Sequence, residues 1–300
     1  MNEILQTIQL SKRFSNAAVL DQLNMSMQEG SLFGLLGPNG AGKSTTLQIL
    51  MNIEKPSSGR AEIFGRDSRQ ISAKDFTQIG YVAEGQELPD WMTVESFMAY
   101  LEPFYPNWDA NLAERLLRGF ELPLDRQLRH LSRGMRMKVA LASSLAYRPR
   151  LLVMDEPFSS LDSLTRDELI EGLLANIDGT SVLISSHDLG EVESFATHIG
   201  YLDRGRLQFS EEMTALGERF REVEITLDDD ACMPTRGWPS SWLLAEHSGS
   251  LVLFIETQFE RERTMAEVGK LFQNAKQVLV RKMPLRAIFI ALAKATRKAA

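Results

Sequence analysis

The sequence predicts an α/β fold with a wound, mainly parallel sheet, followed by a small C-terminal α+β domain. Three observations predict this class. Strand-like apolar runs alternate with helix-like patterns over most of the chain, as in parallel sheets whose strands are joined by crossover helices. Residues 151–154 (LLVM) are entirely apolar, which is typical of a strand buried on both faces. The alternation stops after about residue 215, where short strand-like segments follow one another.

Composition and charge exclude several classes of protein. The chain has 300 residues, of which 44% are hydrophobic and 24% charged, and this suits a soluble globular protein with one large and one smaller domain. A net charge of −7 argues against a general nucleic-acid binder, so no nucleic-acid partner is expected. Cys232 is the only cysteine, so the chain forms no internal disulfide, which fits a reducing compartment.

No targeting or membrane-spanning segment is visible. The N-terminus lacks the basic region and apolar core of a signal peptide. The longest apolar run, residues 287–293, is far shorter than the roughly 18 residues of a membrane helix. We therefore expect a cytoplasmic protein that is soluble or peripherally attached to a membrane.

The N-terminal part of the chain is predicted to form strands. Residues 4–10 and 23–27 mix apolar and polar positions at short range. A turn at Glu29 and Gly30 then leads into the apolar strand 32–36. A loop follows this strand, and a helix is expected directly after the loop.

Helices dominate the middle of the chain. The first helix ends before the Lys-Pro-Ser-Ser-Gly breaker at 55–59. Residues 91–147 are predicted to be largely helical, punctuated by prolines. Further helices are expected at 164–176 and 189–196, on either side of a strand at 181–185.

A second domain is expected at 216–300, after a first domain at 1–215. It is predicted to hold strands at 220–227, 242–245, 251–257 and 277–280, a helix at 261–272 and a last helix that begins at Pro284.

A glycine-rich phosphate-binding motif occupies residues 37–45. The segment GPNGAGKST satisfies G-x-x-x-x-G-K-[ST] and comprises Gly37, Pro38, Asn39, Gly40, Ala41, Gly42, Lys43, Ser44 and Thr45. Its glycines let backbone N–H groups point at phosphate oxygens, and the positive end of the next helix faces the same anion. Lys43 then reaches the β- and γ-phosphates, and the Ser44 hydroxyl binds Mg²⁺. The motif predicts binding of ATP and Mg²⁺.

Asp155 and Glu156 directly follow the buried strand 151–154. Asp155 is a candidate Mg²⁺ ligand, either directly or through water. Its neighbour Glu156 points in another direction and suits polarisation of the attacking water. An Asp-Glu pair alone is common in solvated loops, but its place after four apolar residues favours the catalytic interpretation.

His187 follows the predicted strand 181–185. A lone histidine is usually structural, whereas one at this strand end can hydrogen-bond a γ-phosphate. We therefore predict that Glu156, His187 and Lys43 form the catalytic group of an ATPase.

These residues together resemble the ATP-binding subunit of ABC transporters, over about residues 3–215. The segment 131–138 (LSRGMRMK) resembles the family signature LSGGQ, and Asp162 resembles the D-loop aspartate. His187 resembles the switch histidine, and Phe14 resembles the aromatic residue that stacks on adenine. The resemblance implies a P-loop NTPase sheet of the ABC ATPase type, with an antiparallel β subdomain and a helical subdomain.

The resemblance also implies a mechanism and partners. Two ATPase subunits, identical or different, meet head to tail, so that Ser132 and the Gly134 backbone of one contact the γ-phosphate bound to the other. Hydrolysis separates the two and drives a separate membrane-spanning permease subunit. The chain is then expected to lie peripherally on the inner face of the cell membrane.

Two positions depart from the family pattern. Arg133 replaces the first signature glycine, which limits close backbone approach there but adds a cation. Glu84 stands where the family has glutamine. Its carboxylate can also bind Mg²⁺, and it adds negative charge near the γ-phosphate. Gln86 is the family counterpart if the loop is shifted by two positions.

The C-terminal segment carries an amphipathic stripe formed by Leu285, Ile288, Phe289, Leu292 and Ala293. The stripe either packs within its own domain or contacts anionic lipid. This tail resembles the closing helix of exporter-type subunits, so the expected direction of transport is export.

Two other functions compete with the transporter hypothesis. One is a soluble ABC-type ATPase acting on DNA or ribosomes, but such proteins usually carry long coiled-coil insertions or two ATPase modules, and this sequence shows one phosphate loop and no sustained heptad. The other is a regulatory switch with weak hydrolysis, which Glu84 and Arg133 motivate.

Overall fold

The computed structural model of the chain describes residues 2–15, 17–159, 161–228 and 237–298. The chain forms two compact units, Met1–Ser210 and Glu211–Ala300. The change of sequence pattern near residue 215 lies close to this division. Cys232 falls outside the described residues.

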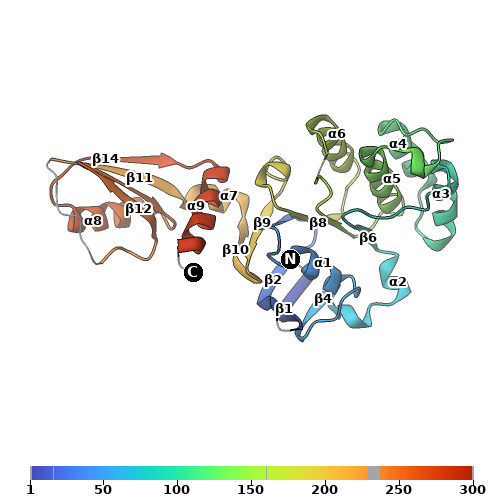
Figure 1. Cartoon of the computed structure of the whole chain (residues 1–300), viewed down its shortest axis with the longest axis horizontal. Helices are drawn as coiled ribbons and strands as arrows, with labels where there is room; N and C mark the ends of the chain where they lie inside the picture. The colour runs from blue at the N-terminus through green and yellow to red at the C-terminus, as the bar shows by residue number, and fades with distance from the viewer. Residues whose placement is uncertain (1, 16, 160, 229–236, 299–300) are drawn as a thin grey trace. The chain divides into compact units, whose positions relative to one another are not determined.

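A six-stranded sheet forms the centre of the first unit (Figure 1). Its strands lie in the order β10 (Arg206–Glu212), β9 (His198–Asp203), β3 (Leu32–Leu36), β8 (Ser181–Ser186), β7 (Leu151–Asp155) and β6 (Ile79–Val82). The pairs β9–β3, β3–β8, β8–β7 and β7–β6 are all parallel. The predicted wound, mainly parallel sheet is therefore confirmed. Every residue of β7 is buried, which explains the uninterrupted apolar run before Asp155.

The ends of three neighbouring strands position the loops of the site. In the parallel register, Leu36 of β3 lies opposite Ser186 of β8, and Asp155 of β7 lies opposite Ser185. Because parallel strands end at one edge of a sheet, the segments that follow β3, β7 and β8 meet there.

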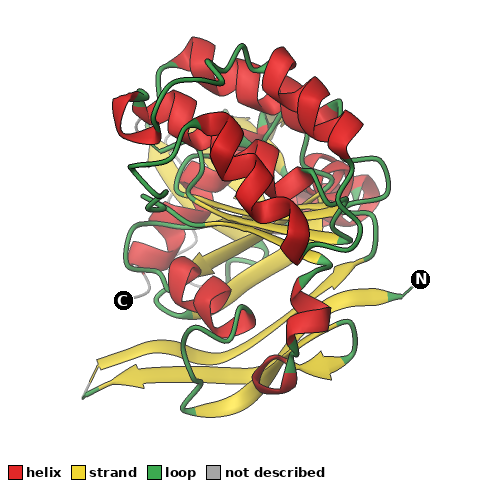
Figure 2. Ribbon diagram, turned by 90° about the vertical axis from the view of Figure 1, so that its right-hand side faces the viewer, coloured by secondary structure: helices red, strands yellow, loops and turns green. Residues whose placement is uncertain are grey.

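An antiparallel sheet forms a second layer of this unit, seen as the lower strands in Figure 2. Its order is β2 (Ala17–Gln28), β1 (Glu3–Phe14), β4 (Ser58–Ile63) and β5 (Arg66–Asp67). One hydrophobic core joins this sheet to the parallel sheet and includes Leu5, Leu23, Leu47, Val153 and Leu183. The predicted antiparallel subdomain is thus present beside the parallel sheet.

Helices cover the parallel sheet and form a subdomain at one side of it (Figure 1, green). The helices of the first unit are α1 (Lys43–Leu50), α2 (Ala73–Phe76), α3 (Val94–Leu101), α4 (Ala110–Gly119), α5 (Arg133–Leu145) and α6 (Ser163–Leu174). Short 3₁₀ turns occur at Ser68–Gln70, Glu102–Phe104, Leu128–His130 and Leu189–Glu191. Side chains of Thr93, Asp109, Ser132 and Asp162 cap the first turns of α3, α4, α5 and α6, which explains why these helices begin where they do.

The second unit is an α+β structure with its own core. Its antiparallel sheet has the order β12 (Trp242–Ser248), β13 (Leu251–Glu256), β11 (Arg221–Leu227) and β14 (Ala275–Lys282), so β12 and β14 are the edges. The helices are α7 (Met213–Arg219), α8 (Arg261–Leu271) and α9 (Leu285–Lys298). The core includes Val223, Trp242, Phe254, Val268 and Phe272. Ile288 and Phe289 of α9 are buried and α9 packs against β12, which favours packing of the apolar stripe within its own unit.

The prediction of a helix at 189–196 is wrong. Only the 3₁₀ turn Leu189–Glu191 forms, with the Asp188 carboxylate accepting a hydrogen bond from Gly190 N at 2.9 Å at its start. The helix does not continue because the chain is drawn into the sheet a few residues later. Thr197 N donates to Leu32 O at 2.8 Å, directly before β9 begins. Among the described residues, no helix combines the length and the apolar composition that crossing a bilayer requires.

Candidate functional site

The loop at 37–45 joins the end of β3 to the start of α1, and close packing requires its glycines. A Cβ on Gly37 would lie 2.1 Å from Leu202 O, and one on Gly42 would lie 2.6 Å from Leu20 Cδ2. Gly40 and Gly42 have φ values of 79° and 106°, in the left-handed region that favours glycine. The backbone can therefore curl as a phosphate-cradling loop requires.

Lys43 is the first residue of α1, and its side chain is buried against the loop that precedes it. Its Nζ donates to Gly37 O at 2.8 Å and to Pro38 O at 3.3 Å. The same Nζ lies 3.0 Å from Glu156 Oε1. The ammonium group therefore connects the phosphate loop to the residue that follows β7.

Asp155 ends β7 and is held by two hydroxyl groups. Its Oδ1 accepts hydrogen bonds from Ser44 Oγ at 3.0 Å and from Ser185 Oγ at 2.6 Å. Ser44 and Asp155 are each predicted from the sequence to bind Mg²⁺, whereas no role is predicted for Ser185. Ser185 lies beside Asp155 because the register of β7 and β8 places these two residues opposite each other.

Glu156 lies between a lysine and a histidine. Its backbone has φ 46°, which is uncommon for a residue other than glycine and turns the side chain away from the direction of β7. Its Oε2 accepts a hydrogen bond from His187 Nδ1 at 2.7 Å. Burial alone would raise the pKa of Glu156, but the hydrogen bonds from His187 and Lys43 outweigh it, so the pKa lies below the usual range. The carboxylate is therefore ionised at neutral pH.

His187 and Glu191 extend this network. The hydrogen bond to Glu156 raises the pKa of His187 above its ordinary value. Glu191 is buried, accepts a hydrogen bond from Ser186 Oγ, and has a pKa raised by burial. Carboxylate and imidazole atoms of Glu156, His187 and Glu191 lie within 4.8 Å of one another. Glu191 was not predicted, and its only sequence signal is its place four residues after His187.

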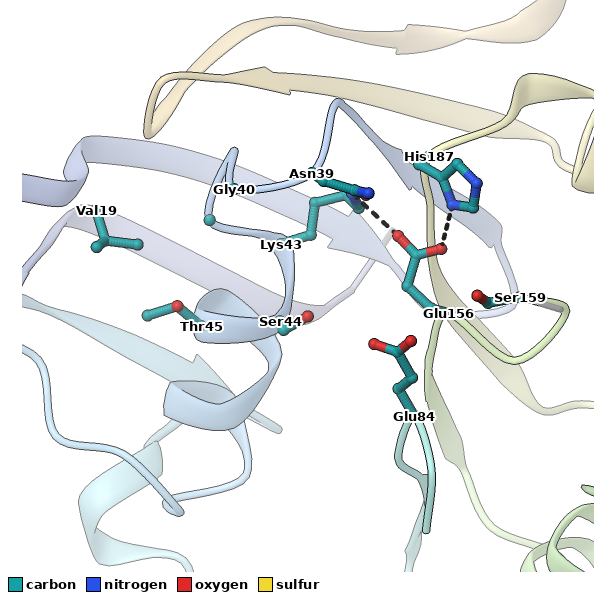
Figure 3. Close-up of a pocket in the computed structure, with 11 residues that line it drawn as sticks. Val19, Asn39, Gly40, Lys43, Ser44, Thr45, Glu84, Glu156, Ser159 and His187 are labelled. Carbon is teal, nitrogen blue, oxygen red and sulfur yellow. Dashed lines mark hydrogen bonds and ion pairs between the residues drawn. The ribbon is translucent and has the colours of Figure 1, made fainter.

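A cavity of about 400 Å³ opens over the phosphate loop (Figure 3). It is lined by Val19, Asn39, Gly40, Gly42, Lys43, Ser44, Thr45, Glu84, Glu156, Ser159 and His187. Glu84 directs its carboxylate toward the space between Ser44 and Glu156. Gln86 instead accepts a hydrogen bond from Ala83 N at 3.3 Å and lies outside this lining. No role for Val19 or Ser159 is predicted from the sequence.

Seven predicted residues do not line this cavity. Gly37, Pro38 and Ala41 belong to the phosphate loop itself, and Asp155 contacts Ser44 beside it. The other three lie elsewhere. Phe14 is the last residue of β1, and its side chain is 43% exposed. Ser132 caps α5 by accepting a hydrogen bond from Met135 N at 3.2 Å. Gly134 lies against α6, where a Cβ would come within 2.6 Å of Thr165 Cγ2. The signature segment is therefore not part of the cavity formed by its own phosphate loop.

Comparisons with known proteins agree with this arrangement. The sequence profile of the ABC transporter family matches residues 20–159, a range that includes the phosphate loop and Glu156. The probable sulfate/thiosulfate import ATP-binding protein CysA of Chlorella vulgaris is 36% identical over 206 residues, covering 66% of this chain and 86% of that protein. The Nod factor export ATP-binding protein I of Cupriavidus metallidurans is 34% identical over 213 residues, covering 69% and 70%.

A solved structure shows the same likeness in three dimensions. An ATP-binding subunit of an ABC transporter superposes with a TM-score of 0.65 at 27% identity, covering 72% of this chain and 92% of that one. Since two relatives that are ATP-binding proteins share 34–36% identity with this chain over 70% or more of their own length, and the family profile matches residues 20–159, the chain belongs to the ABC transporter family, as an ATP-binding subunit that hydrolyses ATP.

Proposed function

We propose that the chain supplies energy to an exporter by hydrolysing Mg²⁺-ATP in the cavity over the phosphate loop. The observation that carries the proposal is the placement of Glu156 between Lys43 and His187 at that cavity. An ionised carboxylate beside the phosphate loop is the group that a hydrolytic reaction needs. The lysine supplies positive charge for the phosphates in the same space.

The residues at the cavity fit Mg²⁺. Ser44 and Asp155 offer a hydroxyl and a carboxylate 3.0 Å apart, and Glu84 offers a second carboxylate. All are oxygen donors, which Mg²⁺ prefers. Asp155 would hold the ion directly or through water. When bound, Mg²⁺ neutralises phosphate charge and orients the terminal phosphate.

The proposed chemical step transfers the γ-phosphoryl group to water. The water oxygen forms a bond to the γ-phosphorus while the bond from that phosphorus to the β–γ bridging oxygen breaks. Glu156 accepts a proton from the water, and ADP and phosphate are the products. His187 holds the Glu156 carboxylate in place at 2.7 Å and donates its other ring N–H toward the γ-phosphate. Lys43 and the backbone N–H groups of residues 40–45 bind the phosphates.

The remaining predicted residues suit the base and a second subunit. Phe14 would stack on adenine. Ser132 and Gly134 would bind the γ-phosphate held by another ATPase subunit, in a homodimer or a heterodimer. Their distance from their own cavity lining supports this role.

The proposed partner is a membrane-spanning permease, with the chain on the inner face of the cell membrane. The likeness to the Nod factor export ATP-binding protein supports export, and the chain is also similar to a probable sulfate/thiosulfate import ATP-binding protein. A tagged chain should co-purify with a polytopic membrane protein from detergent-solubilised membranes of its own host. With ATP outside, inside-out vesicles that hold both proteins should accumulate the cargo. Recovery of the tagged chain without a membrane protein contradicts the proposed partner, and ATP-driven loss of cargo contradicts export.

Glu156→Gln tests the chemistry. We expect steady-state phosphate release to fall about 100-fold or more, while ATP still binds, because the amide keeps the shape of the side chain but accepts no proton. Glu193→Gln is the matched control, since Glu193 is exposed and lies beyond His187 in the same segment. If Glu156→Gln and Glu193→Gln turn over ATP equally fast, Glu156 is not the general base.

A further inference from the structure

Lys12 differs from most lysines because its side chain is buried. It belongs to β1 and is only 8% exposed, although a lysine is almost never buried without a partner. Its Nζ donates to Glu54 Oε1 at 2.6 Å and to Lys55 O at 2.8 Å. The ammonium group is therefore fixed by two oxygens from the turn that follows α1.

This fixed ammonium group lies over the ring of Phe14. Lys12 Nζ is 4.5 Å from the ring centroid, within the roughly 6 Å range of a cation–π interaction. Phe14 is 43% exposed, so part of its surface is open to solvent. Phe14 pairs with Ala17 at the end of the β1–β2 hairpin, and β2 then leads to Val19 at the phosphate cavity.

The contact affects the ring in two ways. A ring held in place loses less freedom when a ligand stacks on it. The cation also withdraws π-electron density from the ring, so the solvent-exposed part of the ring repels the π-electrons of a purine less strongly.

Glu54 keeps the cation in position. The hydrogen bond from Lys12 holds the pKa of Glu54 below its usual range, so its carboxylate stays ionised at neutral pH. Glu54 Oε1 also accepts from Lys55 N at 2.9 Å, and Glu54 N donates to Gln48 O of α1 at 3.2 Å. The helix that begins at the phosphate loop is therefore connected through Glu54 to the aromatic ring.

We propose that Lys12, held by Glu54, positions Phe14 for stacking on adenine. The proposal rests on the function proposed above, in which Phe14 binds the base. Lys12 is a positioning residue, because it acts through Phe14 and contributes affinity for the base rather than for the phosphates. Mg²⁺-ATP and Mg²⁺-tripolyphosphate separate these two contributions, since tripolyphosphate has no base.

The experiment measures dissociation constants of both ligands by calorimetry on the full chain, with Glu156→Gln present in every variant to prevent turnover. Lys12→Met should weaken ATP binding about fivefold and leave tripolyphosphate binding unchanged. Lys12→Arg should restore ATP binding because it keeps the cation. Lys74→Met, which removes an exposed lysine of α2, is the matched control and should change neither constant.

Phe14→Ala distinguishes failure of this inference from failure of the adenine role. It should weaken ATP binding at least as much as Lys12→Met, and the double variant should bind ATP no more weakly than Phe14→Ala alone. If Phe14→Ala weakens ATP binding and Lys12→Met does not, the inference is wrong and the adenine role stands. Equal weakening of ATP and tripolyphosphate by Lys12→Met also overturns the inference. If Phe14→Ala leaves ATP binding unchanged, the adenine role itself is wrong.

Discussion

Glu156 and His187 form a pair in which each group favours the charged form of the other. The pKa of Glu156 is lowered and that of His187 is raised. A carboxylate whose pKa is lowered in the folded protein stabilises the fold when the pH is above the ordinary carboxylate pKa. That stabilisation is lost as the pH falls through the lowered pKa. A histidine whose pKa is raised in the folded protein stabilises the fold when the pH is below the ordinary histidine pKa. That stabilisation is lost as the pH rises through the raised pKa. The pair therefore contributes most to the stability of the fold between the ordinary pKa of glutamate and the ordinary pKa of histidine.

His187→Ala tests this pH dependence. The melting temperature of the native protein should exceed that of the variant most between about pH 5 and pH 6.5, and the difference should shrink as the pH rises from there through the raised pKa of His187. Thermal unfolding from about pH 5 to about pH 9 measures it. His130→Ala, at an exposed histidine, is the control. A difference that stays constant over this range contradicts the pairing.

In the phosphate loop, glycine is required at different positions for different physical reasons. Gly37 is fixed by the approach of Leu202 O, whereas Gly40 has open space where a Cβ would be and a φ of 79°. Space and backbone conformation are separate causes, so the two positions should respond differently to alanine.

Gly37→Ala should destabilise the fold by about 3 kcal/mol, because a methyl group must displace backbone atoms of β9. Gly40→Ala should cost about 1 kcal/mol, for the left-handed conformation alone. Urea unfolding of both variants measures the difference. Equal costs would show that the contact at Leu202 does not constrain the loop.

Sequence patterns predicted the elements whose residues carry a local signal. The buried strand β7 is uniformly apolar, and the loop motif has fixed spacing, so β7, Lys43 and Ser44 could be placed without a structure. The turn after β8 could not, because pairing of Thr197 with Leu32 overrides the helical pattern. The position of Ser185 beside Asp155 depends on the register of two strands far apart in sequence.

The whole molecule presents its signature segment outside its own cavity lining. Ser132 caps α5 with its hydroxyl, so the same side chain that would meet a second subunit also stabilises a helix. A test of the subunit interface must therefore preserve the cap. Asparagine and aspartate both cap helices as well as serine does, and only aspartate adds a negative charge.

Ser132→Asp and Ser132→Asn should separate capping from subunit contact. With Glu156→Gln and ATP present, the asparagine variant should form dimers as the parent does. The aspartate variant should stay monomeric, because its carboxylate repels the γ-phosphate, while each chain still binds ATP. Light scattering measures the mass of both. A dimer of normal stability in the aspartate variant would place the interface elsewhere.

Strand β14 lies at an edge of the sheet in the second unit. An uncovered edge strand is a template for strand addition between molecules. In β14 the apolar residues 278–280 are flanked by exposed Lys276 and by exposed Arg281 and Lys282. Two copies meeting edge to edge would bring these cations together. These charges therefore disfavour aggregation through β14. Neutralising them should favour strand addition between molecules and the formation of insoluble aggregates.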